Sequence, residues 1–182
     1  MKSGIKTVGI DDGHFTKDND KETLVVGAVV RGNIELEGVL RTHIEIDGCD
    51  ATEKIIEMIK KSRHYRQLKA VFTNSIMLGG LNILDINQMY EELGISVIAV
   101  LRKEPNIQKL VDGIKERFPE KAEILVEYGK PKRFGKIYYY SVGKNVEELI
   151  KITTRKGSIP EPIRLAHLIA TGVTLGESRG RA

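Results

Sequence analysis

Two adjacent carboxylates follow the first apolar run of the chain. Residues 5–10 are suited to a strand, and Asp11 and Asp12 come directly after them. Gly13 is next, and glycine allows a turn that larger residues disfavour. Carboxylates at the end of a central strand suit Mg²⁺ or Mn²⁺, because they supply negative charge and leave room for water and phosphate. The alternative is that Asp-Asp-Gly only forms a turn.

Three further polar residues are candidates for the same site. Asp47 and Asp50 precede a helical pattern, and Asn74 follows an apolar run at residues 68–72. All three side chains offer oxygen ligands for a hard cation. Asp47 also has a simple explanation as a turn residue before glycine. Asp50 stands three residues before Glu53, which is the spacing of a capping box, so a structural role competes with a chemical one.

A second set of candidates is suited to binding nucleic acid. Gly79 and Gly80 would let backbone amides approach a phosphate or a base, although two glycines also suit a flexible turn. Arg102 and Lys103 follow an apolar run and could hold phosphate oxygens, or they could simply be solvated. The remaining basic residues would follow a nucleic-acid backbone, with ordinary solubilising charge as the alternative: Lys130, Lys132, Arg133, Lys136, Arg179 and Arg181.

The four histidines show no ligand spacing. His14, His43 and His64 stand apart from one another in the sequence. His167 lies in a helical apolar pattern, and we expect it to be packed or partly exposed rather than functional.

The periodicity of the sequence predicts the elements that position these residues. Strands at residues 5–10, 23–30 and 34–46 predict a three-stranded antiparallel meander. The rest alternates between strand and helix, with strands at 68–72, 96–101, 123–128 and 137–142 and helices after Asp50 and at 85–93, 107–118, 146–153 and 163–175. This order indicates an α/β fold, with a single domain over residues 1–182 and one mixed sheet covered by helices.

The sheet predicts which candidates meet. Sites in such sheets lie beyond the carboxyl ends of the parallel strands. That rule brings together Asp11, Asn74 and Arg102 with their immediate neighbours. Asp47 and Asp50 join them from the start of the first helix.

Composition excludes several classes of protein. The chain has 182 residues, of which 41% are hydrophobic and 30% charged, so it is long and apolar enough to fold around a core. The net charge of +4 permits an anionic partner. The single Cys49 excludes a disulfide framework and a Cys-rich zinc site. No apolar run is long enough to cross a bilayer, and no signal-peptide core follows Met1, so we expect a cytoplasmic protein.

Several segments resemble an archaeal family that includes endonuclease dU. The resemblance covers nearly the whole chain and is carried by residues 9–13, 46–52, 79–82, 160–170 and 176–182. That family is similar to endonuclease V, which has a ribonuclease H-like fold. The resemblance therefore implies this fold, with the meander followed by β–α units.

The resemblance also implies an activity and a site. Endonuclease V cuts nucleic acid near deaminated bases with carboxylate-held Mg²⁺, and its first acid matches Asp11. Its helix-opening acid falls near Asp50, its third acid matches Asn74, and its lysine falls at Arg102. Asparagine can coordinate a cation but brings no negative charge, which weakens metal binding and water activation.

Two functions follow from this pattern. The first is a divalent-metal-dependent endonuclease, with Mg²⁺ or Mn²⁺, that hydrolyses nucleic acid containing uracil or hypoxanthine, with DNA favoured over RNA. The second is a nucleic-acid-binding protein of the same fold with weak or lost catalysis, which the asparagine at position 74 favours. A weaker third option is a metal-dependent enzyme acting on a small phosphorylated substrate. The sequence lacks the glycine patterns of nucleoside-triphosphate and dinucleotide sites.

Overall fold

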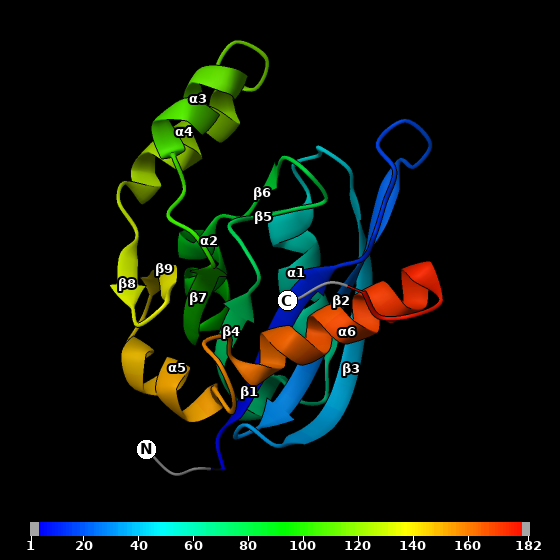
Figure 1. Cartoon of the computed structure of the whole chain (residues 1–182), viewed down its shortest axis with the longest axis vertical. Coiled ribbons are helices and arrows are strands. Elements are labelled where there is room, and N and C mark those ends of the chain that lie inside the picture. The colour runs from blue at the N-terminus through cyan, green and yellow to red at the C-terminus, as the bar shows by residue number, and fades with distance from the viewer. Residues whose placement is uncertain (1–3, 180–182) are drawn as a thin grey trace.

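Seven strands form one mixed sheet at the centre of the protein (Figure 1). The structure is a computed structural model and describes residues 4–179. The strand order is β3-β2-β1-β4-β7-β9-β8. The bounds are β1 Lys6–Asp12, β2 Glu22–Arg31, β3 Glu35–Glu45, β4 Leu68–Thr73, β7 Ser96–Leu101, β8 Lys132–Phe134 and β9 Ile137–Val142. A separate two-stranded ladder, β5 Met77–Leu78 with β6 Asn82–Ile83, follows β4.

The predicted meander is confirmed. Strand β2 pairs antiparallel with both β1 and β3, and β1, β4 and β7 run parallel. The carboxyl ends of these three strands therefore meet at one edge of the sheet. Strand β1 is longer than predicted, because Asp11 and Asp12 still pair with Val26 and Val25 of β2. The two aspartates are thus held by the sheet ladder rather than by a turn.

Helices cover both faces of the sheet. Their bounds are α1 Ala51–Lys61, α2 Ile86–Leu93, α3 Ile107–Ile114, α4 Pro119–Tyr128, α5 Val146–Thr153 and α6 Glu161–Leu175, with a 3₁₀ turn at Tyr65–Gln67. Alternate strand residues such as Val71 and Phe72 face opposite layers, as the pleat requires. Helices α1 and α2 pack on one face and α5 and α6 on the other, while α3 and α4 extend beyond the sheet as a hairpin (Figure 1). Within residues 4–179 no helix has the length and apolarity needed to cross a membrane.

The strand predicted at residues 123–128 is wrong. This segment is the second half of α4, which begins at Pro119. Proline suits the first turn of a helix, because its fixed φ is helical and its missing N–H would have no partner there. Ala122 and Leu125 are three residues apart and both buried, which is the spacing of a helix face. The apolar run resembles a strand only when the preceding proline is ignored.

Two glycines of the β1 segment let α6 lie directly on it. A Cβ at Gly9 would be 2.1 Å from the Pro162 carbonyl carbon, and one at Gly13 would be 2.4 Å from Thr174 Cγ2. The turn predicted at Gly13 is therefore wrong, since its φ is not positive and its small size serves close packing. This contact places the middle of α6 over the end of β1.

Candidate active site at the ends of strands β1 and β4

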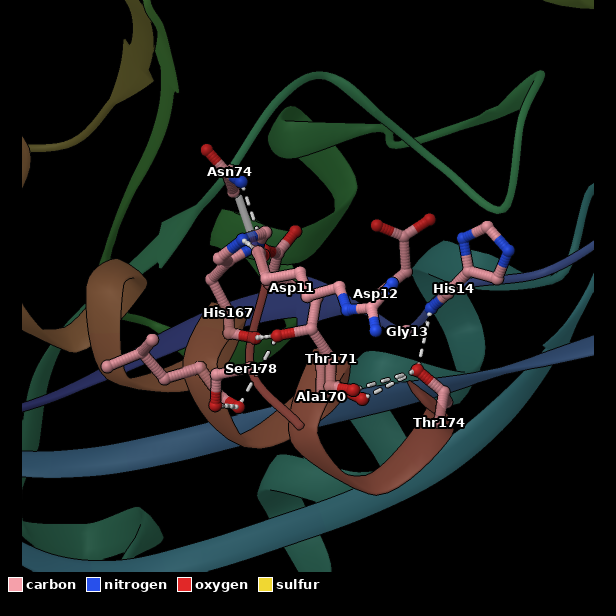
Figure 2. Close-up of polar contacts among 12 residues, drawn as sticks. Asp11, Asp12, Gly13, His14, Asn74, His167, Ala170, Thr171, Thr174 and Ser178 are labelled. Atoms are coloured by element: carbon pink, nitrogen blue, oxygen red, sulfur yellow. Dashed lines mark hydrogen bonds and ion pairs between the residues drawn. The ribbon is translucent and has the colours of Figure 1, made fainter. Parts of the chain in front are cut away.

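Asp11 is the centre of a hydrogen-bonded group built from three elements. Its side chain is buried at the end of β1, with only 3% of the residue exposed. Asn74 follows β4 and donates a hydrogen bond from Nδ2 to Asp11 Oδ2 over 3.0 Å. His167 of α6 places Nδ1 2.8 Å from the same oxygen (Figure 2). A buried carboxylate requires such partners, and these two hold it in one orientation.

The imidazole of His167 faces acceptors on both sides. Its Nε2 lies 3.1 Å from the carbonyl oxygen of Arg179, and its Nδ1 faces Asp11. Carboxylates and carbonyls only accept, so both contacts are hydrogen bonds when the ring carries both protons. The hydrogen bond to Asp11 raises the pKa of His167, and the Arg179 carbonyl adds to this effect. With the ring doubly protonated, Asp11 and the half-buried His167 form an ion pair.

The segment after α6 returns along that helix to reach His167. Gly176 ends the helix with a left-handed φ of 81°, which reverses the chain. Ser178 then donates a hydrogen bond from its hydroxyl to the Leu168 carbonyl over 2.8 Å. Gly172 leaves the space for this contact, since a Cβ there would be 3.3 Å from Ser178 Oγ. Residues 176–179, the C-terminal strap, thus cover the outer side of His167.

Asp12 connects β1 to the glycine loop at residues 79–82. Its Oδ2 accepts a hydrogen bond from the Gly79 amide over 2.7 Å. Burial raises the pKa of Asp12 to about 6, and the neighbouring charge of Asp11 contributes in the same direction, while the Gly79 amide opposes both. Holding two carboxylates together at this buried position therefore costs electrostatic free energy.

Asp47 holds the same loop from the other side. Its Oδ1 accepts a hydrogen bond from the Leu81 amide over 2.7 Å, and its own amide donates to the Gly79 carbonyl over 2.8 Å. Asp47 has a positive φ of 55°, and Lys17 Nζ lies 3.2 Å from its carboxylate. A Cβ at Gly80 would be only 2.3 Å from Asp47 Oδ1. Glycine is therefore required at Gly80 for this carboxylate to approach the loop.

Asp50 also contacts the loop, and the predicted capping box is wrong. Asp50 precedes α1 but accepts no hydrogen bond from its first turn. Its carboxylate instead accepts from Asn82 Nδ2 over 2.7 Å and from the Glu45 amide over 3.1 Å. Asn82 Oδ1 accepts from the Ala51 amide and so performs the capping role. Asp50 has helical φ and ψ, whereas a capping residue needs the extended conformation.

The structure brings part of the predicted set into one pocket. A pocket of about 430 Å³ is lined by Asp11, Asp12, Asn74, His167 and Arg179, among others. Asp47 and Asp50 do not line it, and they hold the glycine loop beside it. Their assignment as metal ligands stays a prediction.

The predicted phosphate-binding residues lie at the same edge of the sheet. Arg102 and Lys103 are exposed after β7, whose carboxyl end lies beside that of β4. The charge of Arg102 acts on His167 and tends to lower the pKa of that ring. Gly79 is buried and Gly80 partly exposed. The assignment of these residues to nucleic-acid binding stays a prediction. Arg181 lies outside the described residues.

The donor set fits a hydrated Mg²⁺ rather than a fully protein-bound metal. No group of three or more His, Cys, Asp or Glu side chains within residues 4–179 is arranged to hold a metal. Asp11 and Asp12 use Oδ2 in the contacts above, and Asn74 uses only its nitrogen. One oxygen of each remains for a cation or its water. Mg²⁺ is commonly held by one or two carboxylates and keeps several waters, so these three residues suit it.

Sequence reasoning missed His167. The signal available was the buried helical spacing of Ile163, Ala166 and Ala170, which turns this side of α6 toward the sheet. That spacing shows that His167 borders the buried stripe but not which strand lies below. The contact with Asp11 spans 156 residues and depends on how α6 crosses β1.

Comparison with known proteins decides the family. Residues 3–174 match the model of the endonuclease dU family. The chain belongs to this family. A relative named UPF0215 protein from Methanothermobacter thermautotrophicus is 41% identical, and the alignment covers all of this chain and 94% of that protein. A crystal structure of a protein of unknown function from Archaeoglobus fulgidus superposes with a TM-score of 0.85 at 35% identity, covering 93% of this chain and 98% of that one.

The endonuclease dU fold seen here is also that of endonuclease V. Endonuclease V from Ciona intestinalis, in complex with a 24mer DNA that contains an inosine followed by a ribo-adenosine, superposes with a TM-score of 0.56. The identity is 14%, and the match covers 90% of this chain and 82% of that protein. The predicted family and the predicted ribonuclease H-like fold are both confirmed.

Proposed function

We propose that this protein is a divalent-metal-dependent endonuclease that hydrolyses nucleic acid containing deaminated bases, uracil or hypoxanthine. One observation carries the proposal, the buried Asp11 carboxylate held between Asn74 and His167 with Asp12 beside it. Membership of the endonuclease dU family and the fold shared with endonuclease V support nuclease activity on nucleic acid. The choice of uracil or hypoxanthine rests on the family resemblance.

Different residues at the site would bind the metal, orient Asp11 and bind the phosphate. Asp11, Asp12 and Asn74 would hold Mg²⁺ or Mn²⁺ through their oxygens, and Asp50 is the further ligand that the family pattern suggests. When bound, such an ion lowers the pKa of water and neutralises charge on the phosphate. His167 fixes the orientation of Asp11 and, when protonated, balances its charge. Arg102 and Lys103 would hold neighbouring phosphate oxygens.

The glycine loop is suited to a base that has left the duplex stack. Enzymes that act at altered bases commonly extrude the base into a pocket. Gly79 and Gly80 present backbone without side chains, and Asp12 and Asp47 hold this backbone from two sides. A loop fixed in this way presents its remaining amides and carbonyls, those not bonded to Asp12 or Asp47, at constant positions, which favours recognition of one base edge over others.

DNA is the substrate we favour. The endonuclease V of Ciona intestinalis binds a DNA that contains inosine, and it shares the fold of this chain. Because that likeness is one of fold, RNA remains the comparison that an experiment must include.

The test uses purified protein with labelled oligonucleotides. DNA and RNA strands carrying uracil, hypoxanthine or only normal bases are incubated with Mg²⁺, with Mn²⁺ or with EDTA. We expect metal-dependent cleavage near the altered base, lost in Asp11→Ala. Exposed Asp18→Ala is the matched control, since it removes an aspartate outside the lining of the pocket. Cleavage that survives in Asp11→Ala, or that ignores the altered base, would overturn the proposal.

Asn74 favours a second candidate function. A nuclease site that lacks one carboxylate binds metal more weakly, so the protein could bind altered nucleic acid without cutting it. In that case the wild type binds the oligonucleotides tightly and does not cleave them, and Asn74→Asp confers cleavage. Cleavage by the wild type excludes this candidate.

A further inference from the structure

A second pocket lies apart from the Asp11 pocket and is strongly cationic. Its volume is about 560 Å³, and it is enclosed by the β8–β9 turn, the end of α5 and the segment that leads to α6. Lys136, Lys151 and Arg155 line it, and no acidic residue does. None of its lining residues belongs to the Asp11 pocket. In Figure 1 these elements lie at the lower left, away from the middle of α6.

Among residues 4–179 the three cations have no partner of opposite charge. Within residues 4–179 the side chains of Lys136, Lys151 and Arg155 form no ion pair and no hydrogen bond. Several other basic residues of the chain are paired, as Lys17 is with Asp47 and Arg164 with Glu161. Like charges gathered around one cavity raise the electrostatic potential in it, and an anion relieves this repulsion.

The backbone that carries the three cations is held by core packing and by a hydrogen bond. Ile150 is buried, and Phe134 packs against the same apolar cluster, so the floor of the pocket is part of the core. The Thr154 carbonyl accepts a hydrogen bond from Asn33 Nδ2 over 3.4 Å, which ties the end of α5 to the β2–β3 turn. Ser158 adds a hydroxyl group to the lining. The pocket therefore combines a rigid base with two ammonium groups, a guanidinium and a hydroxyl donor.

We propose that this pocket binds a backbone phosphate of the nucleic acid that the protein holds, as a second contact remote from Asp11. The choice of nucleic acid as the partner rests on the proposed function. A guanidinium can bind two phosphate oxygens at once, and ammonium groups bind phosphate as point charges. Contacts of this kind position a strand without reading its sequence. The pocket thus fixes how a long substrate lies across α5 and α6 relative to the Asp11 pocket.

The test measures binding without cleavage. Fluorescence anisotropy with a fluorescein-labelled DNA duplex of normal bases is recorded in EDTA at several salt concentrations. The variant is Lys136→Gln, Lys151→Gln and Arg155→Gln together. The control removes three charges from α1 on the opposite face of the sheet, as Lys54→Gln, Lys60→Gln and Lys61→Gln. Circular dichroism and thermal unfolding establish that both triple variants are folded.

We expect the pocket variant to lose about tenfold or more in affinity and the slope of log K against log salt to fall by about one, because each phosphate contact contributes roughly 0.9 to that slope. The control variant should lose less than about threefold, as expected for a change in net charge alone. Equal losses in the two variants, or no loss in the pocket variant, would overturn the inference. Competition by poly-glutamate as effective as competition by unlabelled DNA would do the same, because it indicates a surface for any polyanion. The inference would also be overturned if millimolar inorganic phosphate bound the pocket, seen as thermal stabilisation of the wild type and not of the pocket variant, while the affinity of the wild type for DNA stayed the same. That result would assign the pocket to a free anion.

The inference and the proposed function fail in different ways. If the wild type cuts deaminated oligonucleotides and the pocket variant binds DNA normally, the nuclease assignment stands and the second contact is wrong. If the pocket variant loses binding while the wild type never cleaves, the second contact stands and the nuclease assignment is wrong.

Discussion

Asn74 donates an amide hydrogen to Asp11, whereas an ionised carboxylate at the same position would have no hydrogen to donate. The two residues are 63 positions apart and meet because β1 and β4 are parallel neighbours. The amide therefore keeps Asp11 in place without a metal. A carboxylate at position 74 would repel Asp11 until a cation joined them.

Asn74→Asp should make stability depend on metal. Without divalent ions, we expect the variant to lose about 1–3 kcal/mol of unfolding free energy, because a donated hydrogen bond becomes a like-charge contact in a buried site. Millimolar Mg²⁺ should restore most of this loss in the variant, and it should increase the unfolding free energy of the wild type by a smaller amount. Thermal unfolding with Mg²⁺ or EDTA measures both effects. Asn74→Ala, which loses the bond but adds no charge, should lose stability and respond to Mg²⁺ no more than the wild type does, and a response as large as that of Asn74→Asp would contradict the prediction.

Asp12→Asn should remove a penalty that grows with pH. The pKa of Asp12 is raised to about 6, mainly by burial, so the folded state holds this proton more tightly than the unfolded state. The contribution of Asp12 to the unfolding free energy of the wild type should then fall as pH rises from about 4 to 6, and it should stay unfavourable above that range. Asparagine can still accept from the Gly79 amide, so the variant should be about 1–3 kcal/mol more stable at pH 7 and nearly unchanged at pH 4. Denaturant unfolding at the two pH values measures this, and a variant less stable than the wild type at pH 7 would refute it.

His167→Gln should destabilise the protein more at low pH than at high pH. Because Asp11 raises the pKa of His167, the ion pair contributes fully below the ordinary histidine pKa of about 6.5 and is lost as pH rises through the raised value. Glutamine can still donate to Asp11 but carries no charge. We expect a loss of about 1 kcal/mol at pH 6 that shrinks by pH 9. Exposed His14→Gln is the control, and a loss independent of pH would show that the charge of His167 does not matter.

Gly9→Ala should disrupt the packing of α6 on β1. The new Cβ would be 2.1 Å from the Pro162 carbonyl carbon, which is backbone and cannot rotate away. We expect a loss of about 3 kcal/mol, at the upper end of overpacking costs. Gly113→Ala is the matched control, because nothing lies within 4 Å of its Cβ and α3 should gain roughly 0.5–1 kcal/mol. Denaturant unfolding compares the two, and a neutral Gly9→Ala would mean that α6 does not press on β1.

The sequence allowed the fold and the pairing of Asp11 with Asn74 to be predicted, because both follow from local patterns. Alternating polarity identifies the meander, and strand-end geometry brings the ends of β1 and β4 together. The partner on α6 could not be found in this way. His167 reaches Asp11 through the crossing of a helix over a strand, and that crossing depends on the absence of side chains at Gly9 and Gly13.

The roles of the remaining acids were also beyond local patterns. Asp50 has the spacing of a cap, yet Asn82 takes over the cap from 31 residues away and binds the Asp50 carboxylate. Asp47 likewise holds the loop through the Leu81 amide. Only the path of the glycine loop decides which carboxylates are already engaged.

The C-terminal strap has a practical consequence for handling the protein. Because Arg179 lies against His167 and Ser178 is bonded to α6, a peptide fused directly to residue 179 would start at the rim of the Asp11 pocket. A polyhistidine tag placed there would bring metal-binding imidazoles next to carboxylates whose metal affinity is to be measured. Purification handles therefore belong before β1, which begins at Lys6, at the end of the strand opposite Asp11.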